Sequence, residues 1–209
     1  MASTTTKPVV LPGSLWLLTA GIVGELIFGL AMGMIISFIF IAIQWAGEII
    51  GQQMGLNMSE VFDPQFGAQG SILGSIYFMF SLVVFLLIGG DRLMLMGVHD
   101  SLTTLPRLSV GMSPHLFALI VAVFQASTVL AFKLAAPILV TMLIVDLCMG
   151  FVGKTVPQLN LMSAGLGVHG VAGFLVLIFG VGLTSDVIRQ SMISAMSKVL
   201  WSYHTGLIK

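Results

Sequence analysis

Long runs without a single charged residue limit what this chain can fold into. Residues 71–90, 108–132 and 155–185 contain no Asp, Glu, Lys or Arg. A helix needs about 20 apolar residues to cross the hydrocarbon core of a bilayer, and each run reaches that length. No water enters that core, so the backbone must satisfy its own hydrogen bonds, and no period-two alternation favours a barrel. The sequence therefore predicts an all-α integral membrane protein with some of its helices paired as hairpins.

The runs predict five or six long helices. Residues 15–43 form a further run broken only by Glu25, and residues 134–153 follow Lys133. Two topology signals disagree. A hairpin over residues 116–153 would place the C-terminal tail outside the membrane, whereas the basic residues of that tail favour the inside.

Composition excludes several function classes. The 209 residues are 57% hydrophobic and 8% charged, against about 25% charged in a typical soluble domain. The net charge is zero and no basic run exists, which argues against nucleic acid as a partner. The single cysteine, Cys148, cannot form an internal disulfide or a multi-cysteine metal site. The four histidines lack metal spacing and no catalytic constellation appears, so we expect neither a cofactor nor an enzyme.

Four charged residues lie within or beside the apolar runs, and they are costly wherever they face lipid. We expect them to face a bundle interior, a partner subunit or a water-filled path; they are Glu25, Glu48, Lys133 and Asp146. Lys133 and Asp146 are thirteen residues apart, too far for one helix turn, so any pairing is tertiary. Structural pairing or subunit contact and a transport path both remain open.

Small residues recur at four-residue spacing, which lets helix backbones approach closely. The positions are Gly29 and Gly33, then Gly47, Gly51 and Gly55, then Gly70 and Gly74. Residues 165–170 match G-x-G-x-x-G, but this pattern binds a dinucleotide only between a strand and a helix. Within a charge-free run, a helix contact or a flexible break is the better interpretation.

Two stretches interrupt the helical pattern. Pro157 has no amide hydrogen and ends a helix, and Gln158 and Asn160 could bond the freed carbonyls or reach a partner. The second stretch is residues 51–70, where Asp63-Pro64 indicates a turn. Adaptable apolar side chains recur there every four residues, and they are Met54, Met58, Phe62 and Phe66. A deformable stopper and a plain loop packed on its own bundle both fit.

Several segments resemble the FliR family of the flagellar type III protein-export gate, which is related to the SctT family of virulence secretion systems. They are Ala46-Gly-Glu-Ile-Ile-Gly-Gln-Gln-Met-Gly-Leu56, Val61-Phe-Asp-Pro64, Phe85-Leu-Leu, Ser101-Leu-Thr-Thr-Leu-Pro106, Ala136-Pro137, Asp146-Leu-Cys-Met-Gly150 and Pro157-Gln-Leu-Asn160. Their order and spacing carry the resemblance from about residue 15 to residue 190. The family has a further N-terminal helical region, so a short form, a fragment or a divergent member is expected.

The resemblance implies a subunit of a helical pore assembly, with hairpins tilted and raised from the usual membrane plane. The expected domains are a flexible lead at 1–14, a FliR-like export-gate domain at 15–190 and a polar tail at 191–209. Expected partners are FliP-like, FliQ-like and FlhB-like subunits, unfolded protein substrates and lipid, in the bacterial inner membrane within the flagellar basal body. A stand-alone secondary transporter or ion channel is the alternative.

The family also implies a pore plug over residues 56–66. Carried onto this sequence, the gating residues are Met54, Met58, Phe62, Asp63, Pro64 and Phe66. Gly47, Gly51 and Gly55 would pack the helix from which the plug hangs. Glu25, Glu48, Lys133, Asp146, Pro157, Gln158 and Asn160 would be subunit contacts or buried polar groups.

Overall fold

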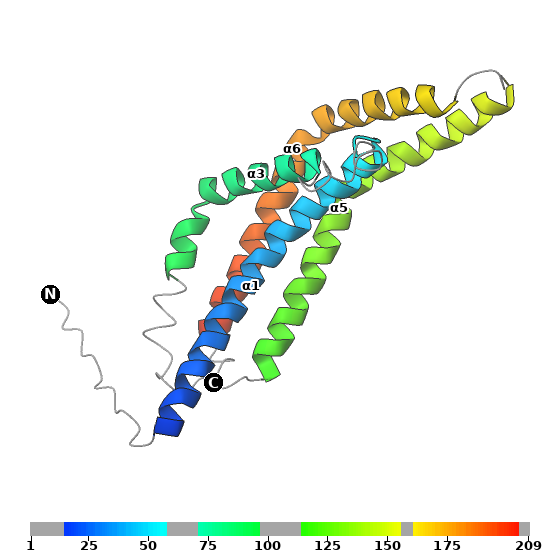
Figure 1. Ribbon diagram of the computed structural model, residues 1–209. Coiled ribbons are helices and arrows are strands. Elements are labelled where there is room, and N and C mark those ends of the chain that lie inside the picture. Colours follow the sequence, from blue (N-terminus) through cyan, green and yellow to red (C-terminus); the bar gives the residue numbers. More distant parts are fainter. Residues whose placement is uncertain (1–14, 58–70, 97–113, 156–160, 205–209) are drawn as a thin grey trace.

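The computed structural model describes residues 15–57, 71–96, 114–155 and 161–204, and most of them are helical (Figure 1). The long helices are α1 (Leu15–Gln53), α3 (Ile72–Leu87), α5 (Pro114–Thr155) and α6 (Leu161–His204). A short helix, Gly90–Met96, follows α3. The described ranges contain no strand, and the prediction of an all-α membrane protein is confirmed.

The described ranges contain four long helices, fewer than the five or six predicted, because α5 is one continuous helix of 42 residues. A hairpin over residues 116–153 is therefore wrong. Lys133 and Pro137 both lie inside the helix. A proline removes one backbone donor and bends a helix without always ending it. Figure 1 shows α5 changing direction along its length. The hydroxyl of Thr141 donates to the carbonyl of Pro137 at 2.8 Å.

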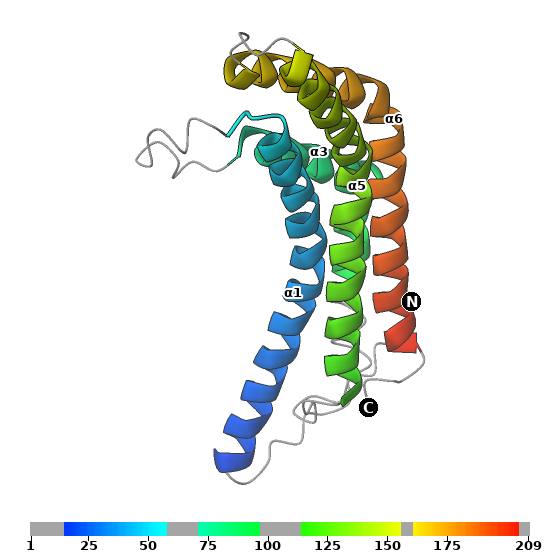
Figure 2. The ribbon, with the colours of Figure 1, turned by 90° about the vertical axis from the view of Figure 1, so that its right-hand side faces the viewer.

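Helix α1 lies at the centre of the arrangement, packed against α3 on one side and α5 on another. Helix α6 packs mainly on α5, and the two form a long antiparallel hairpin. In Figures 1 and 2 the tip of this hairpin turns away from the direction of the lower bundle. The hairpin therefore has a packed base and a projecting arm.

Helices α1 and α3 cross in backbone contact. A Cβ atom added to Gly47 would lie 2.6 Å from the carbonyl oxygen of Leu73 and 2.9 Å from the Cα of Gly74. A Cβ atom on Gly74 would lie 2.8 Å from the Cγ of Glu48. Small residues at a helix crossing allow this approach in membrane proteins. Gly29 and Gly33 share the four-residue spacing, but no described atom would lie within 4 Å of a Cβ atom added at either position.

Aromatic contacts extend the packing on both sides of α1. The ring of Phe40 packs edge-on against two rings of α3. The distance between ring centroids is 5.4 Å to Phe85 and 6.0 Å to Phe78. Phe38 meets Phe124 of α5 at 5.5 Å. Tyr77 of α3 is buried, and α3 also contacts α6. Edge-to-face pairs each add about 0.5–1.5 kcal/mol beyond burial.

Both ends of α3 have defined caps. The hydroxyl of Ser71 accepts a hydrogen bond from the amide of Gly74 at 3.3 Å, so Ser71 is the N-cap. At the other end Gly89 has φ +70°, a conformation that glycine adopts without strain. Across this glycine the chain turns by 67° into the helix Gly90–Met96.

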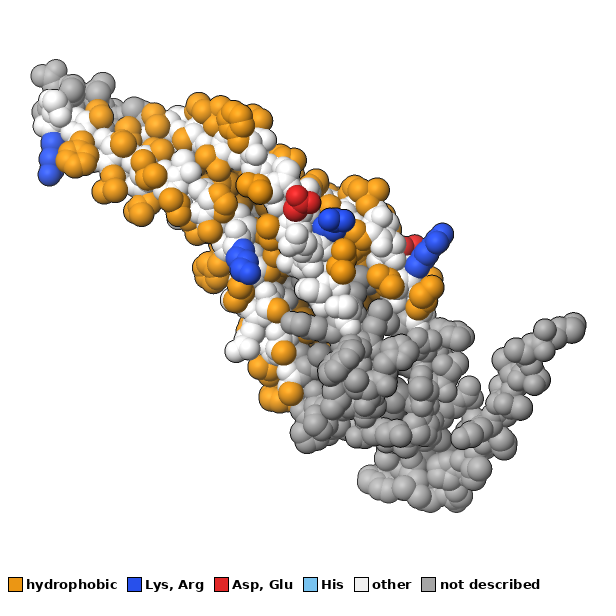
Figure 3. All heavy atoms as spheres, turned by 180° about the vertical axis from the view of Figure 1, so that it is seen from behind, with side chains coloured by type: hydrophobic (Ala, Val, Ile, Leu, Met, Phe, Trp, Pro, Cys, Tyr) orange, Lys and Arg blue, Asp and Glu red, His pale blue; other side chains and the backbone are white. Residues whose placement is uncertain are grey.

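In the described ranges, three helical stretches are long and apolar enough to cross a membrane: Gly33–Gln53, Ile120–Thr155 and Gly165–Ser194. The bent pair Ile72–Leu87 and Gly90–Met96 would add a fourth. The α6 stretch is only 6% buried within the chain, and Phe179 is 83% exposed. Apolar side chains cover much of the described surface in Figure 3, with few charges among them. Lipid or other proteins must cover this surface.

The α1–α3 crossing predicts that substitution by alanine changes the stability of the protein in opposite directions at two glycines. Gly47→Ala should destabilise the protein by about 1–3 kcal/mol, because the new methyl group overlaps backbone atoms that cannot move aside. Gly33→Ala should stabilise it by about 0.5–1 kcal/mol, because its position is open and alanine favours the helix. Denaturant unfolding in detergent measures both. Equal effects of the two substitutions would contradict the backbone contact.

Candidate functional site

The strongest candidate site is the base of segment 58–70, which we define as Gly51, Met54, Gly55, Asn57 and Ser71. Helix α1 ends at Gln53 in a turn in which the amide of Leu56 donates to the carbonyl of Gly51 at 3.0 Å. The amide of Gly55 donates to the carbonyl of Gln52 at 3.0 Å. Gly55 has φ +73°, as expected for the left-handed residue of a Schellman cap.

The two ends of segment 58–70 lie side by side. The hydroxyl of Ser71 donates to the side-chain oxygen of Asn57 at 3.4 Å, a long hydrogen bond. A Cβ atom on Gly51 would lie 3.0 Å from the Ser71 hydroxyl and 3.1 Å from that Asn57 oxygen. Gly51 therefore leaves the room in which the two side chains meet. Asn57 and Ser71, the described residues on either side of segment 58–70, therefore meet between the cap of α1 and the cap of α3.

Met54 anchors this base to α6. Its side chain is only 1% exposed, and a Cβ atom added to Gly173 would lie 2.6 Å from its sulfur. A Cβ atom on Gly55 would lie 2.7 Å from a methyl of Leu166, also on α6. The four-residue spacing and the family resemblance grouped Met54 with the gating residues. The structure instead places its side chain in the core of the chain's own bundle.

The remaining predicted gating residues lie outside the described residues: Met58, Phe62, Asp63, Pro64 and Phe66. The same holds for Pro157, Gln158 and Asn160, between the end of α5 and the start of α6. Glu25 belongs to α1, but its side chain is outside the described part. Glu48 is half-buried at the α1–α3 crossing and accepts a hydrogen bond from Gln44 at 3.0 Å.

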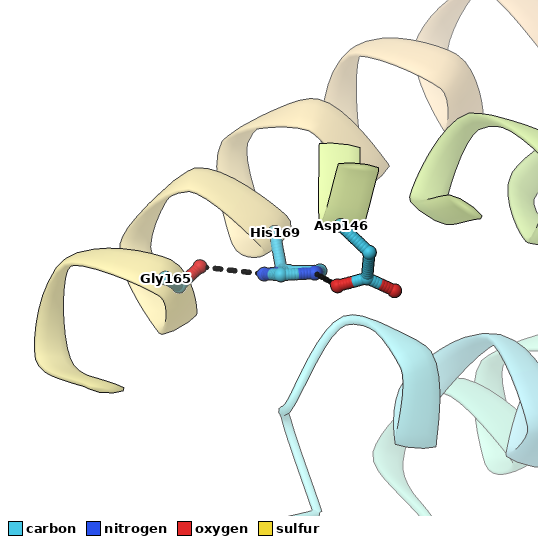
Figure 4. A network of polar contacts seen from close by, with 3 residues as sticks. All are labelled: Asp146, Gly165 and His169. Atoms are coloured by element: carbon cyan, nitrogen blue, oxygen red, sulfur yellow. Dashed lines mark hydrogen bonds and ion pairs between the residues drawn. The ribbon is translucent and has the colours of Figure 1, made fainter. Parts of the chain in front are cut away.

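Asp146 and His169 form a polar contact between the two arms of the α5–α6 hairpin (Figure 4). The Nε2 of His169 lies 2.8 Å from a carboxylate oxygen of Asp146. The Nδ1 of His169 lies 2.7 Å from the carbonyl oxygen of Gly165. The sequence predicted that any pairing of Asp146 with Lys133 would be tertiary, whereas Asp146 contacts His169 on the facing helix. Lys133 is on the same helix as Asp146, about 20 Å along its axis, so the two do not meet.

Both ring nitrogens of His169 have a partner in this contact. A carbonyl oxygen only accepts, so the Nδ1 of His169 must carry a hydrogen. The Nε2 of His169 faces the carboxyl of Asp146, so each of these two polar side chains has a partner in the hairpin. A paired polar group in a membrane helix costs less than one that faces lipid alone.

The sequence patterns did not predict a contact for His169, because the glycines around it match a nucleotide-binding motif. The usable signal was that Asp146 and His169 each lie in an otherwise apolar run and need a polar partner. Among the described residues, no group of three or more His, Cys, Asp or Glu side chains could hold a metal ion.

These features first define a class: the chain is an all-α integral membrane protein with long, bent helices and closely packed glycines. It belongs to the FliR family, within the bacterial export proteins, family 1, whose family model matches residues 1–195.

Individual relatives support the assignment. The chain is 32% identical over 169 residues to the flagellar biosynthetic protein FliR of Bacillus subtilis, covering 79% of this chain and 65% of that protein. It is 30% identical over 155 residues to FliR of Escherichia coli, covering 73% of this chain and 57% of that protein. It is 28% identical over 156 residues to the surface presentation of antigens protein SpaR of Shigella flexneri, covering 73% of this chain and 59% of that protein. The chain thus spans less than two thirds of the length of these relatives.

A double-mutant cycle tests the His169–Asp146 contact. Asp146→Ala and His169→Ala should each destabilise the protein, and their effects should be non-additive by about 1 kcal/mol, because the Asp146 side chain is 59% exposed and partly screened. Lys133→Ala combined with Asp146→Ala is the control and should be additive. The unfolding midpoints of the wild type, the two single variants and the double variant are measured in detergent for each cycle. Additivity in the first cycle would show that the contact contributes nothing.

Proposed function

We propose that this chain is a structural and gating subunit of a bacterial type III protein-export channel. The names of its relatives support this role, since they are flagellar biosynthetic proteins and a protein for surface presentation of antigens. The two flagellar relatives named above are 32% and 30% identical to this chain, against 28% for SpaR, which favours a flagellar system. The chain would shape a channel for unfolded flagellar proteins and perform no covalent chemistry.

The base of segment 58–70 is the observation that carries the gating part of the proposal. A short segment can close a channel only if both of its ends are held in place. Here the ends are held by the Schellman cap at Gly55 and by the N-cap at Ser71. The buried side chain of Met54 fixes the same base against α6. In this proposal Met54 anchors the plug, while Met58, Phe62 and Phe66 supply its adaptable apolar groups.

The exposed apolar surface supports assembly with other membrane proteins. Most of the membrane-length stretch of α6 is uncovered within the chain, and side chains such as Leu183 and Ile178 are more than 60% exposed. We propose that FliP-like and FliQ-like subunits, an FlhB-like subunit and lipid cover this surface. The setting would be the inner membrane, within the flagellar basal body.

A solitary transporter using Glu25, Lys133 and Asp146 has less support. Asp146 already contacts His169, and Lys133 lies about 20 Å away along α5. Copurification separates the two functions. A gate subunit should bring down two other small hydrophobic proteins, whereas a transporter should be active when reconstituted alone.

Replacing residues 58–66 with a Gly-Ser segment of equal length tests the plug. The replacement leaves the base intact and removes the apolar side chains, so the assembled complex should conduct ions in its resting state. Ion conductance of membranes that contain the complex measures the leak. Copurification of the partner subunits provides the control for assembly. A complex that assembles normally and stays closed would refute the plug.

A smaller change tests the base itself. Ser71→Ala removes both the hydrogen bond to Asn57 and the cap of α3, which should cost about 1 kcal/mol and produce a smaller leak than the segment replacement. Ser75→Ala, one turn further along α3 at an exposed position, is the matched control. Equal conductance of the two variants would remove Ser71 from the gating mechanism.

A further inference from the structure

The second half of α5 carries a continuous apolar stripe on its outer side. The side chains of this stripe recur at three- and four-residue spacing, which places them on one face of a helix. Each of them is more than half exposed within the chain, and this part of α5 runs toward the projecting end of the hairpin (Figure 1). We call the set the outer stripe of α5, and it consists of Val140, Leu143, Ile144, Leu147 and Phe151.

Two lysines flank the outer stripe. The side chains of Lys133 and Lys154 are both exposed, and neither forms an ion pair within the described ranges. The two residues are 21 positions apart on one helix, which corresponds to about 32 Å along the helix axis. The hydrocarbon core of a bilayer is about 30 Å thick. The stretch between the lysines therefore has the length of one membrane crossing, with Ile144 near its middle.

Asp146 is the only charged residue of α5 between the two lysines, and it lies on another side of the helix. It follows Ile144 by two residues, which is about 200° around the helix axis. Its carboxylate contacts His169 of α6 at 2.8 Å (Figure 4). The outer stripe is therefore free of charge along its whole length, and Asp146 does not share its surroundings.

The residue types of the outer stripe suit lipid better than a second helix. Membrane helices pack on one another through small residues, which let their backbones approach closely. The outer stripe has only large apolar side chains and contains no glycine, alanine or serine. Helix α6 differs, because Gly167 and Gly182 lie on its exposed surface, and no described atom would lie within 4 Å of a Cβ atom added at either position. The two helices of the hairpin thus present different kinds of surface.

We propose that the outer stripe of α5 faces the hydrocarbon core of the lipid bilayer, with Lys133 and Lys154 at its two headgroup layers. A lysine at the end of a membrane stretch keeps its stem along apolar surface and extends its ammonium group to the lipid phosphates. In the proposed export assembly this face of α5 would lie at the periphery. The lipid contact itself does not depend on the export function.

Spin labels on single cysteines test the contact in the full 209-residue chain. The chain is reconstituted into vesicles of phosphatidylethanolamine and phosphatidylglycerol, alone and with the subunits that copurify with it. The exposed Cys148 is first replaced by serine. Paramagnetic resonance then measures collisions of each label with oxygen, which concentrates in hydrocarbon, and with a water-soluble nickel chelate. The labelled variants are Val140→Cys, Ile144→Cys, Leu147→Cys and Phe151→Cys, with Ile138→Cys as the matched control, because Ile138 is only 3% exposed on the same helix.

We expect oxygen collisions to exceed nickel collisions at every position of the stripe, alone and in the assembly. The ratio of the two should be highest at Ile144→Cys and should fall toward both lysines, while Ile138→Cys should collide little with either reagent. Frequent nickel collisions along the stripe would show that it faces water and would overturn the proposal. Few collisions with either reagent in the assembly would show that another subunit covers the stripe, which would also overturn it. So would a ratio that rises steadily from one lysine to the other, because the two lysines would then not mark the two headgroup layers.

A label on α6 separates this proposal from the proposed function. Leu175 is 51% exposed on α6, and Leu175→Cys should lose oxygen collisions when partner subunits bind, whereas Ile144→Cys should keep them. If no subunit copurifies, the export function fails, and the chain alone still tests the lipid contact. Circular dichroism confirms that each labelled variant keeps its helical content.

Discussion

The backbone contact of α1 with α3 at Gly47 and Gly74 is the constraint from which the rest of the structure follows. In lipid, apolar side chains gain little by leaving their surroundings, so helices associate mainly through close packing and polar contacts. Among the described glycines, those at this crossing bring two helix backbones closest together. Gly51 lies one turn beyond Gly47, and Ser71 lies one turn before Gly74. The base of segment 58–70 is thus an extension of the same crossing.

Helix α6 is held in a different way, through isolated contacts along its length. Gly173 leaves room for the side chain of Met54, and His169 contacts Asp146 near the hairpin tip. Most of its membrane-length stretch stays uncovered. The chain therefore combines a tightly packed pair, α1 with α3, and a loosely attached hairpin arm. A subunit that completes its packing against neighbours needs such an arm.

Sequence patterns predicted the helical class well, because charge-free runs in lipid permit only one backbone solution. Four-residue spacing also singled out Gly47, which lies in the crossing, but it could not separate Gly47 from Gly33, whose surroundings are open. The continuity of α5 was not predictable, since Lys133 and Pro137 look like interruptions until tertiary packing supports them. The burial of Met54 depends on Gly173, more than a hundred residues away in the sequence. A local sequence pattern cannot predict a contact between residues so far apart.

The length of α5 has a consequence for membrane topology. With 42 residues, the helix measures about 63 Å, roughly twice the hydrocarbon core. Predicting the side of the C-terminus from the number of apolar runs assumes that each run crosses the membrane once, from one face to the other. A hairpin with arms this long can dip into the bilayer, lean across it or stand partly above it. In the proposed assembly, the tilt at which neighbouring subunits hold the hairpin would then decide which side of the membrane each terminus occupies.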